Sequence, residues 1–277
     1  MSELKSSQNG EVVSMHNLLV DYQRELSFLI ATGHSTMVIP TGFTDIDRIF
    51  SPRRGGVTLL AGKTGVGKTS LGLNIGLQSA DRFRSRVAFF SMEMKAIGLV
   101  HKAVSAYSGV DSIRIHSGSI TTSESRKIMH AVQILEDLPV QFDDSAQQTM
   151  NQLVEKIENI QQESGLDLVV VDRVEMLSKP KRVSDLDKLR QVATELNIGI
   201  LALTNTLTSP TSKKRNLYAE NAEAIWFLHR DDQDNRHSEK QGIAEVHIIK
   251  NRYGPTGQIS LLLNARTGKF LDLEVYP

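Results

Sequence analysis

Residues 62–69 read Gly-Lys-Thr-Gly-Val-Gly-Lys-Thr, between an apolar run at 57–60 and an apolar helical stretch at 68–80. This is the complete G-x-x-x-x-G-K-[ST] phosphate-loop pattern, in the strand–loop–helix context that the pattern requires. Glycines let successive backbone N–H groups turn toward an anion, and the positive end of the following helix adds to that attraction. A chance glycine turn before a helix is the alternative, but it has to fill all four fixed positions. The stretch therefore predicts a binding site for a nucleoside triphosphate.

Two positions of this loop and one later carboxylate have expected roles. Lys68 is expected to reach the β- and γ-phosphates, and the Thr69 hydroxyl is expected to bind Mg²⁺. Asp172 ends an apolar run at 168–171, so its carboxylate is expected beside the same Mg²⁺, at the carboxyl end of a buried strand. The predicted nucleotide-binding residues are Gly62, Lys63, Thr64, Gly65, Val66, Gly67, Lys68, Thr69, Ser70, Asp172 and Asn205.

Hydrolysis also needs a group that activates water. Glu93 stands just past a predicted strand at 87–90, and it faces the γ-phosphate if that strand neighbours the phosphate-loop strand. The alternative for Glu93 is an exposed acid that begins a helix, where the helix dipole favours acids. Asn205, two residues past the apolar run at 198–203, is a candidate to sense the γ-phosphate through its amide; an ordinary loop residue is the alternative.

Beyond residue 42, short apolar runs alternate with helical stretches. This alternation predicts an α/β fold: a mostly parallel sheet with helices on both faces and Trp226 in the core. The last two strands are joined by a turn rich in Gly and Pro at 251–257, which predicts an antiparallel hairpin. Strands are predicted at 57–60, 87–90, 140–142, 168–171, 198–203, 224–228, 244–249 and 259–263, and helices near 68–80, 97–108, 122–136, 149–163 and 184–196.

A separate helix is predicted at 13–31. Its apolar side chains follow helical spacing at Leu18, Tyr22, Leu26 and Leu29, and Gly33 is suited to end it. A helix with one apolar stripe has to bury that stripe on something. The residues alone leave two partners open, the core of the same chain and a neighbouring subunit.

Composition excludes several classes of protein. The 277 residues include 32 Lys+Arg, 32 Asp+Glu and no cysteine, which rules out disulfides, cysteine-bound metals and thiol nucleophiles. The N-terminus lacks the order of a signal peptide and no run of about 18 apolar residues occurs, so we expect a cytoplasmic protein with no membrane partner. Zero net charge, taken by itself, leans away from nucleic acid.

With these residues in place, the chain resembles the C-terminal, RecA-like motor domain of the DnaB-type replicative DNA helicases. The resemblance runs from Val13 to about Glu274, and its most specific piece is Lys-Asn-Arg-Tyr-Gly-Pro-Thr-Gly at 250–257. The other pieces are Pro-Thr-Gly-Phe-Thr-Asp-Ile-Asp at 40–47, the phosphate loop, Phe-Ser-Met-Glu-Met at 90–94, Val-Asp at 171–172, Phe-Leu-His-Arg-Asp at 227–231 and Gly-Ile-Ala-Glu-Val at 242–246.

The resemblance implies further roles. It makes Glu93 the water-activating base, and makes Lys250 and Arg252 a finger that reaches the γ-phosphate bound by the neighbouring subunit. Without it, Lys250 and Arg252 are ordinary solvated charges near a turn. It also implies a homo-oligomer, typically a hexamer, in which the helix at 13–31 packs on the adjacent subunit. The implied organisation is a disordered tail at 1–12, a linker helix and connection at 13–40, and one RecA-like ATPase domain at 41–277.

The chain departs from the family pattern in several places. The family's N-terminal collar, which binds primase, has no counterpart in these residues. After Asp172 the family has Tyr-Leu-Gln-Leu-Met, whereas residues 173–177 read Arg-Val-Glu-Met-Leu, and Asn205 stands where the family has Gln. Two segments at the family's channel positions, 178–187 and 209–216, look short, but they remain basic. Their cations are Lys179, Lys181, Arg182, Lys213, Lys214 and Arg215.

Cations repeated around a ring bind the backbone of single-stranded DNA without reading its sequence. The alternative is that these two basic segments are ordinary solvated loops. The expectation is therefore a ring-forming ATP-dependent DNA helicase motor that uses ATP and Mg²⁺ and translocates on single-stranded DNA during replication. Another replisome protein, such as a full-length helicase, a primase or a loader, is a further candidate partner. The alternative function is a helicase-derived ATPase that loads or assembles another helicase without unwinding DNA itself.

Overall fold

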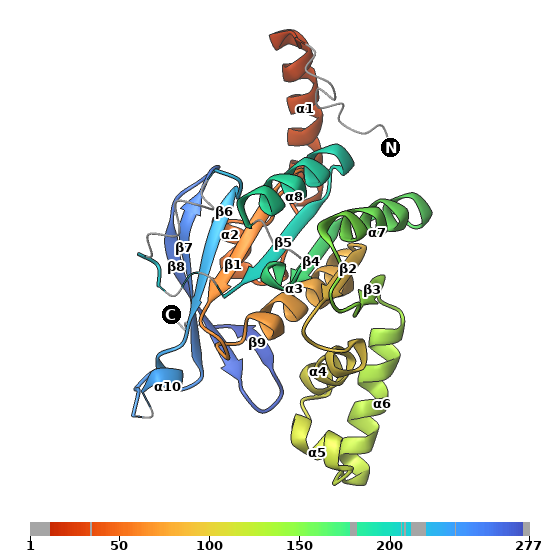
Figure 1. The fold of residues 1–277 in the computed structure, drawn as a ribbon, viewed down its shortest axis with the longest axis vertical. Helices are drawn as coiled ribbons and strands as arrows, with labels where there is room; N and C mark the ends of the chain where they lie inside the picture. The colour runs from red at the N-terminus through yellow and green to blue at the C-terminus, as the bar shows by residue number, and fades with distance from the viewer. Residues whose placement is uncertain are drawn as a thin grey trace.

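A computed structural model describes residues 12–33, 35–177, 182–205, 207, 209–211, 220–235 and 237–273. Its centre is a nine-stranded sheet in the order β3-β2-β4-β5-β1-β6-β7-β8-β9 (Figure 1). Neighbours from β3 to β6 in this order are parallel, and those from β6 to β9 are antiparallel. The strands are β1 (Val57–Gly62), β2 (Val87–Ser91), β3 (Val140–Asp143), β4 (Leu168–Asp172), β5 (Gly199–Thr204), β6 (Ala224–His229), β7 (Ile243–Asn251), β8 (Gly257–Asn264) and β9 (Lys269–Asp272).

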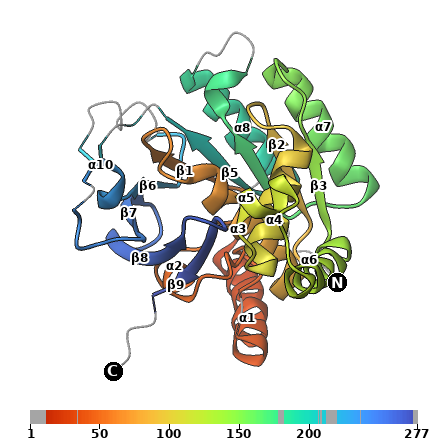
Figure 2. The same cartoon turned by 90° about the horizontal axis from the view of Figure 1, so that it is seen from below.

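Helices cover both faces of this sheet, as Figures 1 and 2 show. One face carries α3 and α4, and the other carries α7 and α8. None of the helices in the described part of the chain is long and apolar enough to cross a membrane. The helices are α1 (Met15–Thr32), α2 (Thr44–Ile49), α3 (Lys68–Phe83), α4 (Ala96–Ser108), α5 (Ser112–Ser117), α6 (Thr122–Glu136), α7 (Met150–Glu163), the 3₁₀ turn η1 (Val174–Met176), α8 (Arg182–Leu196) and α10 (Asp231–Asp234).

The parallel strands β1, β2, β4, β5 and β6 are buried on both faces, which explains why they read as continuous apolar runs, whereas β3 at the edge of the sheet is only partly buried. Leu59 and Leu60 are adjacent in β1 but belong to different core clusters, because successive side chains of a strand point to opposite faces. Leu60 packs in the cluster that contains Leu71 of α3, and Leu59 packs in the cluster that contains Leu189 of α8. Trp226 is fully buried. The predicted α/β fold, the hairpin β7–β8 and the core position of Trp226 are confirmed.

The elements that the sequence did not predict are short. They are α2, α5, η1, α10 and β9, each of three to six residues, too few to show a helical or alternating period. One predicted loop is wrong in part, because α8 begins at Arg182 and the segment 178–187 was expected to be a loop. The helix predicted near 184–196 thus begins two residues earlier than expected, and Leu186 in its first turns packs in the core.

Helix α1 projects away from the body of the protein (Figure 1). Its predicted stop is confirmed, because Gly33 has φ 75° and its N–H donates to the carbonyl of Leu29. Glu25 is the one buried residue of this helix, and its carboxylate accepts hydrogen bonds from the Ser35 hydroxyl and from the backbone N–H and hydroxyl of Thr36. These bonds hold the helix to the connection that follows it.

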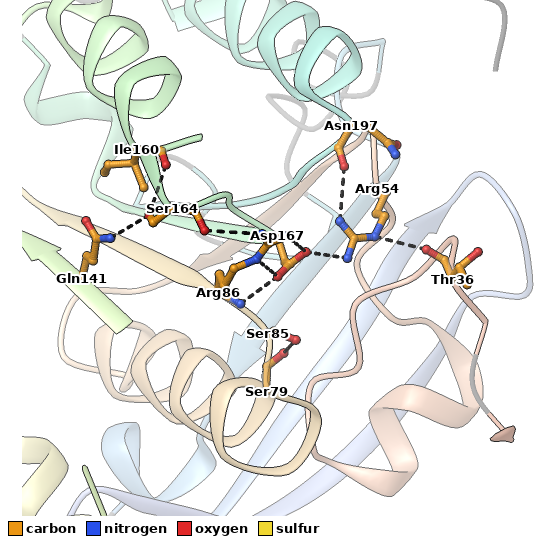
Figure 3. Close-up of polar contacts among 10 residues, drawn as sticks. All are labelled: Thr36, Arg54, Ser79, Ser85, Arg86, Gln141, Ile160, Ser164, Asp167 and Asn197. Carbon is orange, nitrogen blue, oxygen red and sulfur yellow. Dashed lines mark hydrogen bonds and ion pairs between the residues drawn. The ribbon is translucent and has the colours of Figure 1, made fainter. Parts of the chain in front are cut away.

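The connection is tied in turn to the amino ends of the parallel strands (Figure 3). Arg54 donates to the carbonyl of Thr36 at 3.1 Å and to the carboxylate of Asp167 at 2.7 Å. Arg86 donates to the same carboxylate through its backbone N–H at 2.8 Å and its Nε at 2.9 Å. Burial alone would raise the pKa of Asp167, but the hydrogen bonds from Arg86 and Arg54 outweigh it and hold this pKa well below its usual value.

Candidate active site

The phosphate loop connects the end of β1 to the start of α3, as predicted. Gly65 and Gly67 have φ angles of 81° and 109°, in the region that favours glycine. Lys68 is only 6% exposed, and its Nζ donates to the carbonyls of Gly62 at 2.9 Å and Lys63 at 2.7 Å. Burial, helped by the positive charge of Arg173, lowers the pKa of Lys68 to about 8. The loop thus holds a partly desolvated cation, and a bound anion would stabilise its positive charge.

Thr69 and Asp172 meet although 103 residues separate them. The start of α3 lies beside the carboxyl end of β4. The Thr69 hydroxyl donates to Asp172 Oδ2 at 2.7 Å. Asp172 is 1% exposed, and its other oxygen, Oδ1, has no hydrogen-bond partner within the described ranges. Burial raises the pKa of this carboxyl. A hydroxyl oxygen beside a buried carboxylate with an unused oxygen fits the hard oxygen ligands of Mg²⁺.

Glu93 reaches this edge by a different route from the predicted one. The premise that β2 neighbours β1 is wrong, because β4 and β5 lie between them in the sheet. Ser91 of β2 instead pairs with Asp172 of β4, which brings Glu93 close to the Asp172 carboxylate. The Glu93 side chain is 46% exposed, and its Oε2 lies 2.7 Å from Nη2 of Arg173. Glu93 is therefore at the site, paired with a cation that the sequence did not single out.

Glu175 is a second charged residue of the site that the sequence reasoning did not select. Its Oε1 accepts hydrogen bonds from the Thr204 hydroxyl and from the backbone N–H of Asn205, so it joins η1 to the end of β5. Its Oε2 and the side-chain oxygen of Asn205 are buried and have no partner among the residues that the structure covers. The signal available in the sequence was the pair of charges, Arg173 and Glu175, directly after a fully apolar strand.

Two more contacts fix the surroundings of the loop. Gln233 of α10 donates from Nε2 to the carbonyl of Thr64 at 2.9 Å, so the segment after β6 lies against the phosphate loop. On the other side, Lys102 Nζ is 3.5 Å from the hydroxyl of Ser70. Neither Gln233 nor Lys102 was predicted. A helix of four residues and a side chain of α4 are recognisable as neighbours only in the folded chain.

Lys250 and Arg252 lie far from the loop of their own chain. Asn251 pairs with Ala224 at the start of β6, and Ala224 pairs with Thr58 at the start of β1. The phosphate loop follows the other end of β1, and at about 3.3 Å per residue the distance from Thr58 to Gly62 alone is about 13 Å. The two cations therefore lie at the amino ends of the parallel strands, and the phosphate loop lies at their carboxyl ends.

The turn that carries these cations is well anchored. Lys250 Nζ donates to the carbonyl of Ala222, and the backbone N–H of Arg252 donates to the carbonyl of Glu223 at 2.9 Å. Tyr253 donates its hydroxyl to the Glu223 carboxylate at 2.9 Å, and Arg53 lies over the Tyr253 ring at 4.3 Å. Burial, with the charge of Arg252, lowers the pKa of Lys250.

The predicted DNA-binding residues are mostly beyond what the structure covers. Lys179, Lys181, Lys213, Lys214 and Arg215 lie outside the described residues. Arg182 lies in the first turn of α8, with only its backbone described. The role of these cations stays a prediction.

Comparison with known proteins agrees with this geometry. A family model described as "DnaB-like helicase C terminal domain" matches residues 38–272. The "Replicative DNA helicase DnaB" of Geobacillus stearothermophilus is 28% identical over 295 aligned positions, which cover 99% of this chain and 65% of that protein. The "Replicative DNA helicase DnaC" of Bacillus subtilis is 28% identical over 257 positions, which cover 85% of this chain and 57% of that protein. The chain thus spans about three fifths of the length of these relatives.

Two solved structures show the same RecA-like fold. "ATPase Domain of G40P" superposes with a TM-score of 0.84 at 23% identity, covering 95% of this chain and 100% of that one. "The Structure Of A DnaB-Like Replicative Helicase And Its Interactions With Primase" superposes with a TM-score of 0.81 at 23% identity, covering 95% of this chain and 68% of that one.

Proposed function

The chain belongs to the family of DnaB-like helicase C-terminal domains, and we propose that it is the ATP-driven motor of a ring that translocates on single-stranded DNA in DNA replication. The observation that carries this proposal is the distance between Lys68 and the pair Lys250 and Arg252, which lie at opposite edges of one sheet. A nucleotide bound at the loop of one subunit meets these cations only when another subunit supplies them.

Each part of the loop contributes one interaction to nucleotide binding. Lys68 and the backbone N–H groups of residues 62–67 bind the phosphates, because a buried cation and inward-facing amides are stabilised by an anion. Thr69 and Asp172 hold Mg²⁺, which when bound neutralises charge on the phosphate oxygens. In the hydrolysis of ATP to ADP and phosphate, Glu93 accepts the proton of the attacking water.

The finger in trans couples hydrolysis to assembly. Lys250 and Arg252 of one subunit supply positive charge to the γ-phosphate held by the next, as arginine fingers do in other P-loop NTPases. The bonds that anchor residues 250–253 keep this turn rigid, so the cations are held in position before the subunits meet. An isolated subunit then hydrolyses ATP slowly.

The surface of the chain supports a head-to-tail assembly of this kind. Helix α1 exposes Leu18, Tyr22, Leu26 and Leu29 along one side, each between 38% and 57% exposed. Helices α4 to α6, at the opposite end of the long axis in Figure 1, expose another set of apolar side chains. A contact between two different surfaces closes into a ring when the rotation permits, and a hexamer is the size we propose. The second set is Ile97, Val100, Ile113, Met129 and Val132.

The basic segments around residues 179–182 and 213–215 are the proposed contacts to DNA. Six cations per subunit, repeated around a ring, bind a phosphate backbone without sequence preference. A replisome protein is the proposed further partner, because one of the similar solved structures is described as a DnaB-like replicative helicase and its interactions with primase.

The test is ATPase activity with and without single-stranded DNA, together with strand displacement on a forked duplex. The wild type is expected to hydrolyse ATP faster with DNA and to displace the strand. Lys68→Ala should lose both activities, because the phosphates lose their main cation. Lys156→Ala is the control: Lys156 is also a partly buried lysine, but it lies in α7 and pairs with Asp143 outside the phosphate loop, so this variant should keep most activity.

The outcomes separate the two functions that the sequence raised. Displacement that requires Lys68 supports the motor. ATP hydrolysis without displacement, even with DNA present, would contradict it and favour the assembly factor.

A further inference from the structure

Arg173, which directly follows Asp172 in the chain, forms an ion pair with Glu93 at the carboxyl ends of the parallel strands. Nη2 of Arg173 lies 2.7 Å from Oε2 of Glu93. The Arg173 side chain is 19% exposed and that of Glu93 is 46% exposed, so the cation is the more buried member.

Arg173 acts on the phosphate site as well as on Glu93. Its positive charge helps to lower the pKa of Lys68, and it also opposes the rise that burial causes in the pKa of Asp172. The guanidinium is therefore close enough to influence the cation that holds the phosphates and the carboxylate proposed for Mg²⁺. Glu93 can act on the attacking water only when its carboxylate is within about one water of the γ-phosphate. The Arg173 guanidinium is bonded to that carboxylate and belongs to the residue directly after Asp172, so it lies at the same end of the strands.

The guanidinium also has hydrogen-bonding capacity left. Arginine has five N–H donors in a planar fork that suits phosphate oxygens. In the part of the chain that the structure covers, Nη2 donates to Glu93 and to the Met176 sulfur at 3.8 Å, and Nε is buried with no hydrogen-bond partner. A terminal phosphate carries up to two negative charges, against one for a carboxylate, and so competes well for the same donors.

We propose that Arg173 is a γ-phosphate ligand supplied by the same subunit, which pairs with Glu93 in the absence of triphosphate and exchanges that carboxylate for the γ-phosphate when a nucleoside triphosphate binds. The exchange leaves the Glu93 carboxylate available to accept a proton from water only when a γ-phosphate is present. A diphosphate leaves the pair intact, because it has no γ-phosphate to offer. Arg173 thus distinguishes the two nucleotides, and this inference rests on the proposed nucleotide site.

The test compares the affinities for two probes, a fluorescent non-hydrolysable ATP analogue and fluorescent ADP, both with Mg²⁺. Arg173→Ala is expected to weaken binding of the ATP analogue by about tenfold or more, since a charge-assisted hydrogen bond is lost, and to change ADP affinity by less than about twofold. Arg173→Lys keeps the charge without the fork, so its affinity for the ATP analogue should lie between those of the wild type and Arg173→Ala. Arg114→Ala is the matched control, because Arg114 also pairs with a carboxylate, Glu124 at 2.8 Å, on helices away from the phosphate loop.

A double-mutant cycle with Glu93→Gln tests the exchange itself. Removing the competing carboxylate should tighten binding of the ATP analogue severalfold in protein that has Arg173, and most of this gain should vanish in the Arg173→Ala background. Equal changes in ATP-analogue and ADP affinity, or a gain from Glu93→Gln that does not depend on Arg173, would overturn the inference. The melting temperature of each variant checks its folding. Loss of DNA-stimulated hydrolysis in the wild type would count against the proposed function alone, because the affinity ratio is measured without hydrolysis.

Discussion

Lys250 pairs with Ile225 near the start of β6, whereas Lys68 follows the far end of the neighbouring strand β1, so the two lysines lie at opposite edges of one sheet. Neither side chain can cross that distance within one chain. If both act on the same γ-phosphate, they come from different subunits, and catalysis depends on the contact between them.

Mixing two inactive variants tests this arrangement. Lys68→Ala keeps its finger and Arg252→Ala keeps its phosphate loop, so some interfaces in a random mixture combine the two intact parts. Each variant alone should be inactive, and an equal mixture should regain about a quarter of the wild-type ATPase rate. A mixture of Lys68→Ala with the Lys68→Ala/Arg252→Ala double variant should regain nothing. If the first mixture forms oligomers that contain both variants and yet stays inactive, a finger in trans is contradicted.

The lowered pKa of Lys68 predicts a pH dependence of nucleotide binding. With a pKa of about 8, Lys68 is mostly charged at pH 7 and mostly neutral at pH 9. Affinity for a non-hydrolysable ATP analogue should therefore fall up to about tenfold per pH unit above the pKa. The measurement is a binding titration at each pH. Lys68→Ala should bind weakly and show no such fall, and a flat wild-type profile would refute the role of this proton.

Asp167 is expected to contribute to stability at neutral pH. Asp167→Asn leaves Arg54 and Arg86 without their shared carboxylate and should lower the free energy of unfolding by about 2 kcal/mol at pH 7, allowing for the exposure of both arginines.

The pKa of Asp167 is lowered in the folded protein, so its contribution is present above the unfolded pKa of about 3.9 and is lost as pH falls further. The difference between wild type and Asp167→Asn in urea unfolding should accordingly shrink below about pH 4. Asp45→Asn is the control, since the pair of Asp45 with Arg48 is exposed, and its effect should be small at any pH. A constant difference across the pH range would argue against the ion pairs as its cause.

The apolar side of α1 is expected to hold subunits together. Tyr22 is 57% exposed in one chain, so Tyr22→Asp should leave the melting temperature of the dilute protein almost unchanged. It should raise the concentration needed for assembly by about tenfold or more, because a buried aromatic contact would be lost. Mass photometry over a concentration series measures this. Ser27→Asp, an exposed position on the other side of the helix, should assemble normally, and equal effects of both variants would exclude the stripe as the interface.

Local patterns in the sequence were enough to predict most of the fold. The strands and long helices were predicted because each carries its own signal, an apolar run or a helical period, within fewer than twenty residues. The phosphate loop was predicted for the same reason, since residues 62–69 contain every group that the loop needs. Short elements such as β9 and α10 carry no period and were missed.

The sequence by itself therefore determined a RecA-like α/β domain with a phosphate loop, and the residue types near it. Only the tertiary structure decided which of them meet. Glu93 is joined to Arg173, and Glu175 to Thr204 and Asn205, because β2, β4 and β5 lie side by side, an order that no short stretch of residues specifies. The same order separates Lys68 from Arg252. Distances along the chain say little about distances in space, since strand pairing brings remote residues together and holds others at opposite edges.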